Sequence, residues 1–276
     1  MDRTDNVYEF YNNGAEIGRL ERGLGLVEFD RTKEIIAHYL KGNLRICDIG
    51  GGIGKYSEWL ASLGHDVTLV ELAPSAVEYA KEHMTVPYEA MVGDARKIDL
   101  PDNSFDMVLL MGPLYHLLNR EDRLLALSEA YRILKDNGIL IAAGISKFSS
   151  ATWALSVYGN GNEFIDDDIY MDMIMREMDI GEHIKPKEYP YIIADAYFHT
   201  IDSLRNEIRQ AGFSVIDSVA VEGCSWITPD IEEKWKDDNR RQRLLEIIRA
   251  TENEETMMGI SPHFIVSADK NGTEEA

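Results

Sequence analysis

Cysteine and basic residues are scarce in this chain of 276 residues, and long apolar runs are absent. The two cysteines, Cys47 and Cys224, lie far apart, so they provide neither a disulfide framework nor a metal-ligand spacing. No apolar run approaches the ~20 residues that span a bilayer, and the polar first residues do not have the pattern of a signal peptide. We therefore expect a soluble, cytoplasmic protein.

The shortage of basic residues limits the partners that the chain can bind. Lysine and arginine number 28 against 49 aspartate and glutamate residues, which gives a net charge of −21. Nucleic acids and anionic lipids are bound largely through basic side chains, and the sequence shows no cluster of them. We therefore expect neither a nucleic-acid nor a membrane partner. Hydrophobic residues, at 45%, suffice for the core of one large domain or of a domain with an insertion.

The most informative stretch of the chain runs from Ile46 to Leu72. An apolar strand ends in Asp48, an amphipathic segment follows, and a second apolar strand is closed by Glu71. The turn after the first strand carries four glycines: Gly50, Gly51, Gly52 and Gly54. A strand, glycine turn, helix, strand and acid in this order is how an open α/β sheet binds adenosine. The turn lets backbone approach the ligand closely, and the final acid is placed to accept hydrogen bonds from ribose hydroxyls.

The spacing of the turn differs from a dinucleotide fingerprint. Lys55 stands where Gly-x-Gly-x-x-Gly would need its third glycine, so the pattern is Asp-x-Gly-x-Gly-x-Gly from Asp48 to Gly54. A carboxylate ahead of the turn would repel a pyrophosphate, whereas it suits a ligand with an ammonium and a sulfonium group. The chain here resembles the class I S-adenosylmethionine (AdoMet)-dependent methyltransferases, whose first motif is this acid-plus-glycine turn. The resemblance implies AdoMet as the cofactor.

The resemblance also implies a role for each strand-end acid. Asp48 would accept hydrogen bonds from the donor's ammonium group, directly or through water, with an Asx turn or helix cap as its alternative. Glu71 would bind the ribose hydroxyls, unless it is merely a solvent-facing acid. Asp94 and Ala95, after the third strand, would contact the adenine, although aspartate also ends strands for turn reasons alone. The full set expected to bind the donor is Tyr11, Asp48, Gly50, Gly51, Gly52, Gly54, Glu71, Leu72, Asp94, Ala95 and Met111.

Residues 105–117 form the fourth predicted strand and the loop that leaves its carboxyl end, where open α/β sheets place ligands. Met111 and Gly112 are expected beside the donor, and the candidate catalytic residues Tyr115 and His116 toward the acceptor. His116 is the only obvious general base there. A helix cap or a core hydrogen bond is an equal alternative, and methyl transfer to a thiol or amine needs little base assistance. No metal is expected, because catechol-type methyltransferases carry an acid just after this strand and this chain does not.

Short apolar strands alternate with helical patterns, which predicts a Rossmann-like, doubly wound α/β sheet. The first five strands are predicted near 44–48, 66–70, 88–92, 105–110 and 139–145. The helices between them are predicted near 55–63, 74–83 and 120–134, the last with a stop signal at Gly138. A helix over 201–211, a strand over 214–221, a helix over 231–251 and a strand over 262–268 complete the pattern. This ending matches the class I methyltransferase sheet of seven strands, the last antiparallel.

Four regions are expected around this pattern. Residues 1–43 would be an N-terminal helical cap, with helices near Tyr8–Asn13, Arg19–Arg22 and 29–40. Residues 44–146 and 200–268 would form the AdoMet-binding domain, and residues 269–276 a flexible tail. Residues 147–199 are too long for a plain loop, so they are read as a helical lid that defines the substrate. In similar small-molecule methyltransferases the N-terminal segment covers the cofactor cleft, which would place Tyr11, Arg22 and Arg31 there. In the lid, Met171, Met173, Met175 and Met178 would line an apolar pocket or a core.

The expected function is AdoMet-dependent methyl transfer to a small-molecule acceptor with an O, N or S nucleophile. The reaction would be an in-line displacement driven mostly by positioning, which recovers ~7–11 kcal/mol of barrier. One alternative is a non-catalytic AdoMet-binding sensor. Another is a protein- or RNA-directed methyltransferase, of which the RNA form is disfavoured by charge. Neither the acceptor nor the oligomeric state can be inferred from the sequence.

Overall fold

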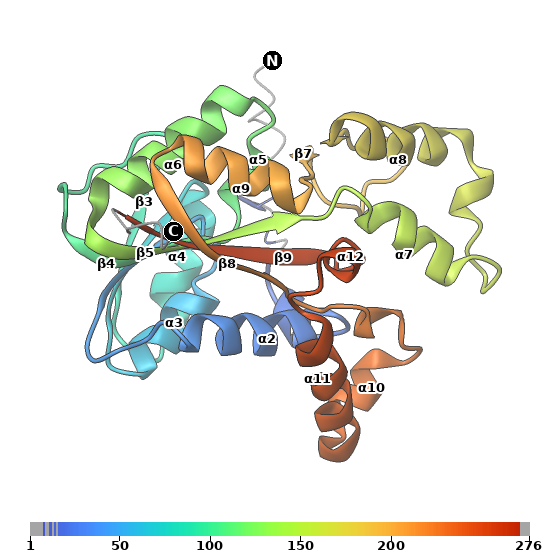
Figure 1. Cartoon of the computed structure of the whole chain (residues 1–276), viewed down its shortest axis with the longest axis horizontal. Helices are drawn as coiled ribbons and strands as arrows, with labels where there is room; N and C mark the ends of the chain where they lie inside the picture. The colour runs from blue at the N-terminus through green and yellow to red at the C-terminus, as the bar shows by residue number, and fades with distance from the viewer. Residues whose placement is uncertain (1–7, 9–10, 13, 15, 271–276) are drawn as a thin grey trace.

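The computed structural model describes Tyr8, Tyr11, Asn12, Gly14 and residues 16–270. A mixed sheet of seven strands in the order β3-β2-β1-β4-β5-β9-β8 runs through the molecule (Figure 1). Its strands are β1 (Arg45–Ile49), β2 (Asp66–Glu71), β3 (Glu89–Val92), β4 (Phe105–Leu110), β5 (Leu134–Ile145), β8 (Phe213–Ala220) and β9 (His263–Lys270). Strand β9 is antiparallel to both β5 and β8, and the other neighbours are parallel. The predicted α/β class with an antiparallel last strand is confirmed.

Helices cover both faces of the sheet (Figure 1). Helices α2 (Gly25–Ala37) and α3 (Lys55–Ser62) pack on one face, and α6 (Arg120–Ile133) and α9 (Ile201–Gln210) on the other. In β4, Met107 belongs to the apolar core under α2 and α3, and its neighbour Val108 to the core under α6 and α9. A strand buried on both faces is apolar at nearly every position, which is why the sequence signal here was strong. Among the described helices, none is both long and apolar enough to cross a membrane.

One long helix of the sequence pattern is two helices in the structure. Residues 231–251 divide into α10 (Ile231–Lys236) and α11 (Asp238–Thr251). Asp237 between them has extended backbone, and its carboxylate accepts the backbone N–H of Arg240 at 2.9 Å. Aspartate at such a position starts a new helix by satisfying an unpaired amide. The single-helix prediction was wrong because the apolar periodicity continues through this cap.

The ends of two further elements also differ from the prediction. Helix α6 stops at Ile133, and β5 starts at once with Leu134, which pairs with Phe105 before a shift in register. The left-handed residue of this connection is Asn137 (φ 60°), whereas Gly138 was expected to provide the stop. At the carboxyl end, the predicted tail over 269–276 begins too early. Lys270 is still in β9 and is buried, with its ammonium group donating to Leu134 O at 2.7 Å; residues 271–276 lie outside the described part.

The N-terminal region begins, in the described part, with the short 3-10 helix η1 (Arg19–Glu21), followed by α2. Helix α2 starts at Gly25 and ends at Ala37, earlier at both ends than the predicted 29–40. A side chain at Gly25 would stand 2.1 Å from Arg19 O, so the close approach of these two elements requires glycine. The predicted helix near Tyr8–Asn13 falls partly outside the described residues.

The segment 147–199 is only partly helical. It contains α7 (Ser149–Val157), η2 (Phe164–Asp166) and α8 (Asp168–Ile180), which extend from one end of the sheet (Figure 1). It ends in a two-stranded ladder of β6 (Glu182–His183) and β7 (Ala196–Tyr197) that the sequence did not predict. Of the lid methionines, Met173 is buried in a small core of its own with Ala154, Tyr170 and Ile174, whereas Met175 is exposed. The core interpretation therefore holds for Met173.

Candidate active site

The glycine turn joins β1 to α3 at the carboxyl edge of the sheet. Gly50, Gly52 and Gly54 all have positive φ (71°, 58° and 79°), a conformation that other residues rarely adopt. A side chain on Gly50 would stand 2.5 Å from Cδ of Pro113, the first residue of α5 (Pro113–His116). The turn is therefore pressed against the loop that follows β4, and glycine is required for this contact.

Asp48 lies beneath this turn and is fully buried. Its Oδ2 accepts the hydroxyl hydrogen of Ser57 in α3 at 2.7 Å, and its Oδ1 has no partner among the described residues. A side chain on Gly51 would stand 2.3 Å from Oδ2, so the carboxylate fits closely against the backbone of the turn. Burial raises the pKa of Asp48 to about 6, although the hydrogen bond from Ser57 opposes this shift.

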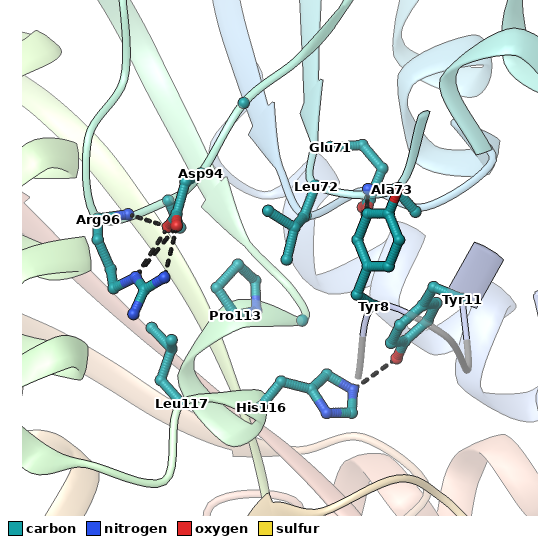
Figure 2. A pocket seen from close by; sticks show the side chains of 14 residues that line it. Tyr8, Tyr11, Glu71, Leu72, Ala73, Asp94, Arg96, Pro113, His116 and Leu117 are labelled. Atoms are coloured by element: carbon teal, nitrogen blue, oxygen red, sulfur yellow. Dashed lines mark hydrogen bonds and ion pairs between the residues drawn. The ribbon is translucent and has the colours of Figure 1, made fainter. Parts of the chain in front are cut away.

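Two cavities open beside the turn, and Tyr11, Gly50 and Gly112 line both of them. The first cavity lies between the ends of β2 and β3 and helix α5, with the N-terminal tyrosines on its far side (Figure 2). The predicted donor-binding residues that line it are Tyr11, Gly50, Glu71, Leu72, Asp94 and Ala95. Gly51, Gly52 and Met111 line the second cavity. Asp48 and Gly54 line neither, because Asp48 is beneath the turn and Gly54 packs against the hydroxyl of Tyr88.

Two acids in the first cavity are held by hydrogen bonds. The carboxylate of Glu71 accepts the backbone N–H groups of Gly52 and Ala73, both at 2.9 Å, which fixes it between the turn and the end of β2. Burial raises the pKa of Glu71. Asp94 accepts two or more hydrogen bonds from the guanidinium of Arg96, the shortest 2.6 Å (Figure 2). Burial alone would raise the pKa of Asp94, but these bonds and the charge of Arg96 hold it below its ordinary value.

His116 sits in the wall of the first cavity with both ring nitrogens engaged. Nε2 lies 2.6 Å from the hydroxyl of Tyr11 (Figure 2), and Nδ1 lies 3.4 Å from the backbone oxygen of Asp195. A carbonyl oxygen only accepts, so Nδ1 carries the hydrogen and Nε2 accepts from the tyrosine. Burial lowers the pKa of His116 to about 4, which keeps the ring neutral at physiological pH. The other predicted catalytic residue, Tyr115, lines the second cavity, and burial raises the pKa of its phenol.

The second cavity is lined by charged residues that the sequence did not single out. Arg19 of η1 donates to both carboxylate oxygens of Glu28 in α2, at 2.6 and 3.0 Å, and also pairs with Glu16 at 2.8 Å. Arg19 is thus the arginine of the described N-terminal segment that lines the second cavity. Of the two arginines expected there, Arg22 is exposed, and Arg31 is buried and pairs with Glu34 and Glu252. The boundaries of η1 and α2 decide which arginine faces inward, and the sequence did not reveal them.

A second histidine, His263 at the start of β9, also lines the second cavity. Its Nδ1 lies 2.7 Å from Oε1 of the fully buried Glu222, which follows β8, and 4.0 Å from Glu28. Burial alone would lower the pKa of His263, but the charges of Glu222 and Glu28 raise it to about 9, against a smaller opposing effect of Arg19. The carboxyl oxygens and ring nitrogen of Glu28, Glu222 and His263 lie within 4.8 Å of one another, a spacing that a metal ion could use. The guanidinium of Arg19 on both oxygens of Glu28 would repel such an ion.

Together these residues place two neighbouring cavities at the carboxyl edge of the sheet. Strand-end acids and the start of a side-chain-free turn line the first cavity, and three of its lining residues also line the second. The glycines of the turn have positive φ angles, and the buried Oδ1 of Asp48 has no partner among the described residues. In the described part, the segment 147–199 lines neither cavity and reaches the site through the Asp195 backbone oxygen on His116.

Comparisons with known proteins agree with this geometry. Residues 47–142 match a family model described as a methyltransferase domain. The chain is 28% identical to the ubiquinone biosynthesis O-methyltransferase of Cereibacter sphaeroides over 195 residues, which cover 69% of this chain and 67% of that protein. Two solved structures of AdoMet-dependent methyltransferases share the fold. One, from Methanosarcina mazei, has a TM-score of 0.57 at 21% identity and covers 86% of this chain and 96% of that one. The other, from Mesorhizobium loti, has a TM-score of 0.58 at 17% identity and covers 87% and 98%.

Proposed function

Because this chain belongs to the class I AdoMet-dependent methyltransferases, we propose that it methylates a small-molecule acceptor bound in the second cavity. The observation that carries the proposal is that the two cavities are neighbours, since Tyr11, Gly50 and Gly112 line both of them. A donor that lies along the glycine turn would pass from one cavity to the other at these residues. Its methyl group would then face a space lined by side chains of the protein, which suits a small acceptor.

The first cavity would hold the adenosine part of the donor. A carboxylate offers about four lone-pair sites, so Glu71 has accepting capacity beyond its backbone hydrogen bonds from Gly52 and Ala73, which suits ribose hydroxyls. Leu72 and Ala95 would pack on the adenine, and Asp94 would accept from its amino group. The residues of the glycine turn would lie along the methionine part. AdoMet supplies an activated methyl group on sulfur, so the task of the protein is to exclude water and to align the acceptor.

Asp48 would act through the turn. Its buried carboxylate lies against Gly51 and would hold the turn in the conformation that the donor needs. A positive charge near the turn would strengthen this interaction, because an ionised carboxylate in a buried site is poorly solvated. Oδ1 of Asp48, which has no partner among the described residues, would accept the expected hydrogen bond from the ammonium group, directly or through water.

The small-molecule acceptor is supported by the name of the relative from Cereibacter sphaeroides, an O-methyltransferase of ubiquinone biosynthesis. The acidic surface of this chain adds support, because a charge of −21 disfavours nucleic-acid acceptors.

The test has a binding arm and a product arm. Calorimetry with AdoMet should show binding, and Glu71→Ala should weaken it at least about 100-fold because two charge-assisted hydrogen bonds are lost, each about 1.5–3 kcal/mol. Asp66→Ala, at the exposed start of the same strand, is the matched control and should bind normally. Mass analysis after incubation with a panel of phenols, thiols and amines should then find a methylated product. Binding without any product would favour a sensor, and methylation confined to lysate macromolecules would favour a protein- or RNA-directed enzyme.

A further inference from the structure

Glu222 and His263 form a fixed pair at the junction of β8 and β9. Glu222 accepts three hydrogen bonds: from the Ser261 hydroxyl and the His263 backbone N–H, both at 3.0 Å, and from His263 Nδ1 at 2.7 Å. Its side chain is fully buried, so these bonds hold it in one position. A carboxylate that accepts from Nδ1 fixes both the orientation and the tautomer of the ring, since the proton then sits on Nδ1.

The other ring nitrogen is the one left for a ligand. The side chain of His263 is 23% exposed and lines the second cavity. Its Nε2 has no hydrogen-bond partner in the part of the chain that the structure describes. Among the charged groups that face the ring, Glu222 and Glu28 favour its protonated form and Arg19 opposes it. The pair therefore stabilises an imidazolium at the wall of the cavity proposed for the acceptor.

We propose that His263, held by Glu222, stays protonated through the reaction and donates Nε2–H to the methyl acceptor, and that this acceptor is a weakly acidic O–H or S–H compound that reacts as its anion. This inference rests on the proposed function. The acceptor anion would lie against Nε2–H and form the new bond to the methyl carbon. As that bond forms, the carbon–sulfur bond breaks and its electron pair returns to sulfur, which leaves S-adenosylhomocysteine. The acceptor's own proton is released when it binds as the anion, so the ring ends the step still protonated.

An amine acceptor fits the pair less well. An amine must present a free lone pair to the methyl group, and a neighbouring imidazolium would donate its hydrogen to that lone pair. The ionised oxygen of a phenol or the sulfur of a thiol keeps further lone pairs for attack while it accepts a hydrogen bond. With a pKa raised to about 9, His263 also lies near the acidity of such groups, which is the condition for efficient proton sharing.

The same pair has a purely structural interpretation, in which it only fastens β8 to β9. It also has a metal-site interpretation, in which Glu28, Glu222 and His263 would coordinate a cation. The three interpretations predict different behaviour of a bound acceptor. Only in the proton-site interpretation does the imidazole ring of His263 itself change the ionisation of a probe bound in the cavity. A metal site would lose its effect on treatment with a chelator.

The test uses coloured probes and does not depend on turnover. Protein saturated with S-adenosylhomocysteine is titrated with 4-nitrophenol, and in a second arm with 4-nitrothiophenol, whose anions absorb differently from the neutral forms. We expect at least one bound probe to ionise with an acid constant raised about tenfold or more, equivalent to about 1.4 kcal/mol. His263→Gln should abolish the effect. Glu222→Gln, which keeps the shape of the pair, should reduce it, because the ring loses the charge that favours its protonated form.

The controls separate the failure of this inference from the failure of the proposed function. His38→Gln, at the exposed end of α2, should ionise the probes as the wild type does. Calorimetry with S-adenosylhomocysteine establishes that each variant is folded and binds the donor product. If neither probe binds, if both variants ionise them as the wild type does, or if a chelator removes the effect, the proton site is wrong. If the wild type does not bind S-adenosylhomocysteine, the proposed function is wrong instead.

Discussion

Replacing Asp48 by asparagine should remove a pH-dependent loss of stability that the buried carboxylate imposes on the fold. Burial raises the pKa of Asp48 from 3.8 to about 6. The folded state therefore binds a proton more tightly than the unfolded chain, and stability falls as pH rises between these two values. At about 1.4 kcal/mol for each pKa unit, the loss is about 3 kcal/mol once the carboxyl group is ionised in both states.

The measurement is the difference in the free energy of unfolding between Asp48→Asn and the wild type, taken by urea titration at several pH values. Because other acids are common to both proteins, their contributions cancel. Below about pH 3 the difference reflects only the exchange of groups, and it should shift in favour of the variant by about 3 kcal/mol by about pH 7. A difference that does not change with pH would refute the argument that the carboxylate is ionised in a poorly solvated site.

A second substitution tests the same site from its partner. Ser57→Ala removes the hydroxyl that donates to Asp48, which is the largest effect opposing the rise in its pKa. The pH-dependent loss should therefore become larger than in the wild type. Calorimetry with AdoMet completes the test, since Asp48→Ala should abolish binding if the carboxylate holds the glycine turn. An unchanged affinity would contradict that role.

Three further substitutions test other contacts of the site and the fold. Gly50→Ala places a side chain 2.5 Å from Cδ of Pro113 at a positive φ, so donor affinity in calorimetry and the melting temperature should both fall, and wild-type values of both would contradict this contact. Arg123→Met leaves the buried Glu207 without its bidentate partner, so urea unfolding should show a free energy of unfolding lowered by about 3–5 kcal/mol. A decrease smaller than about 1 kcal/mol would mean that the ion pair is solvated. Tyr11→Phe removes the hydroxyl that donates to His116, and donor affinity should fall about fivefold, which corresponds to one hydrogen bond of about 1 kcal/mol.

The parts of the site that the sequence predicted are those built from single strands and the turns that follow them. Glu71 and Asp94 end neighbouring parallel strands, and the carboxyl ends of such strands meet at one edge of a sheet. Glycines in a turn after a strand indicate, without further information, a place where a ligand can approach the backbone. The positions of these motifs along the chain were therefore enough to predict residues that line the first cavity, without knowledge of the packing.

The second cavity could not be predicted in the same way. Glu222 and His263 are separated by 41 residues and meet because β9 inserts between β5 and β8. No local spacing marks either residue as part of a site. Arg19 depends on a 3-10 turn of three residues, which is too short to show a periodic pattern. Long-range topology and short helical turns are where the sequence interpretation failed.

The orientation of Asp48 is a further limit of pattern-based inference. The motif fixed its position at the end of β1 but not which way its carboxylate turns. In the structure the next elements decide this, because Ser57 in α3 donates to it and Gly51 lies against it. A motif can therefore fix the position of a residue while the elements around it set the direction of its side chain.

The two histidines of the site have different surroundings, and this difference is why we propose His263 as the residue beside the acceptor. The sequence favoured His116 because it follows the fourth strand, yet both of its ring nitrogens are engaged and burial lowers its pKa to about 4. His263 has one nitrogen held by Glu222, and neighbouring carboxylates raise its pKa to about 9. Two groups of the same type whose environments move their pKa values apart are suited to different roles. A neutral His116 accepts from Tyr11 in the wall of the first cavity, whereas the ring of His263 presents Nε2–H to the second cavity, where the proposed acceptor would lie.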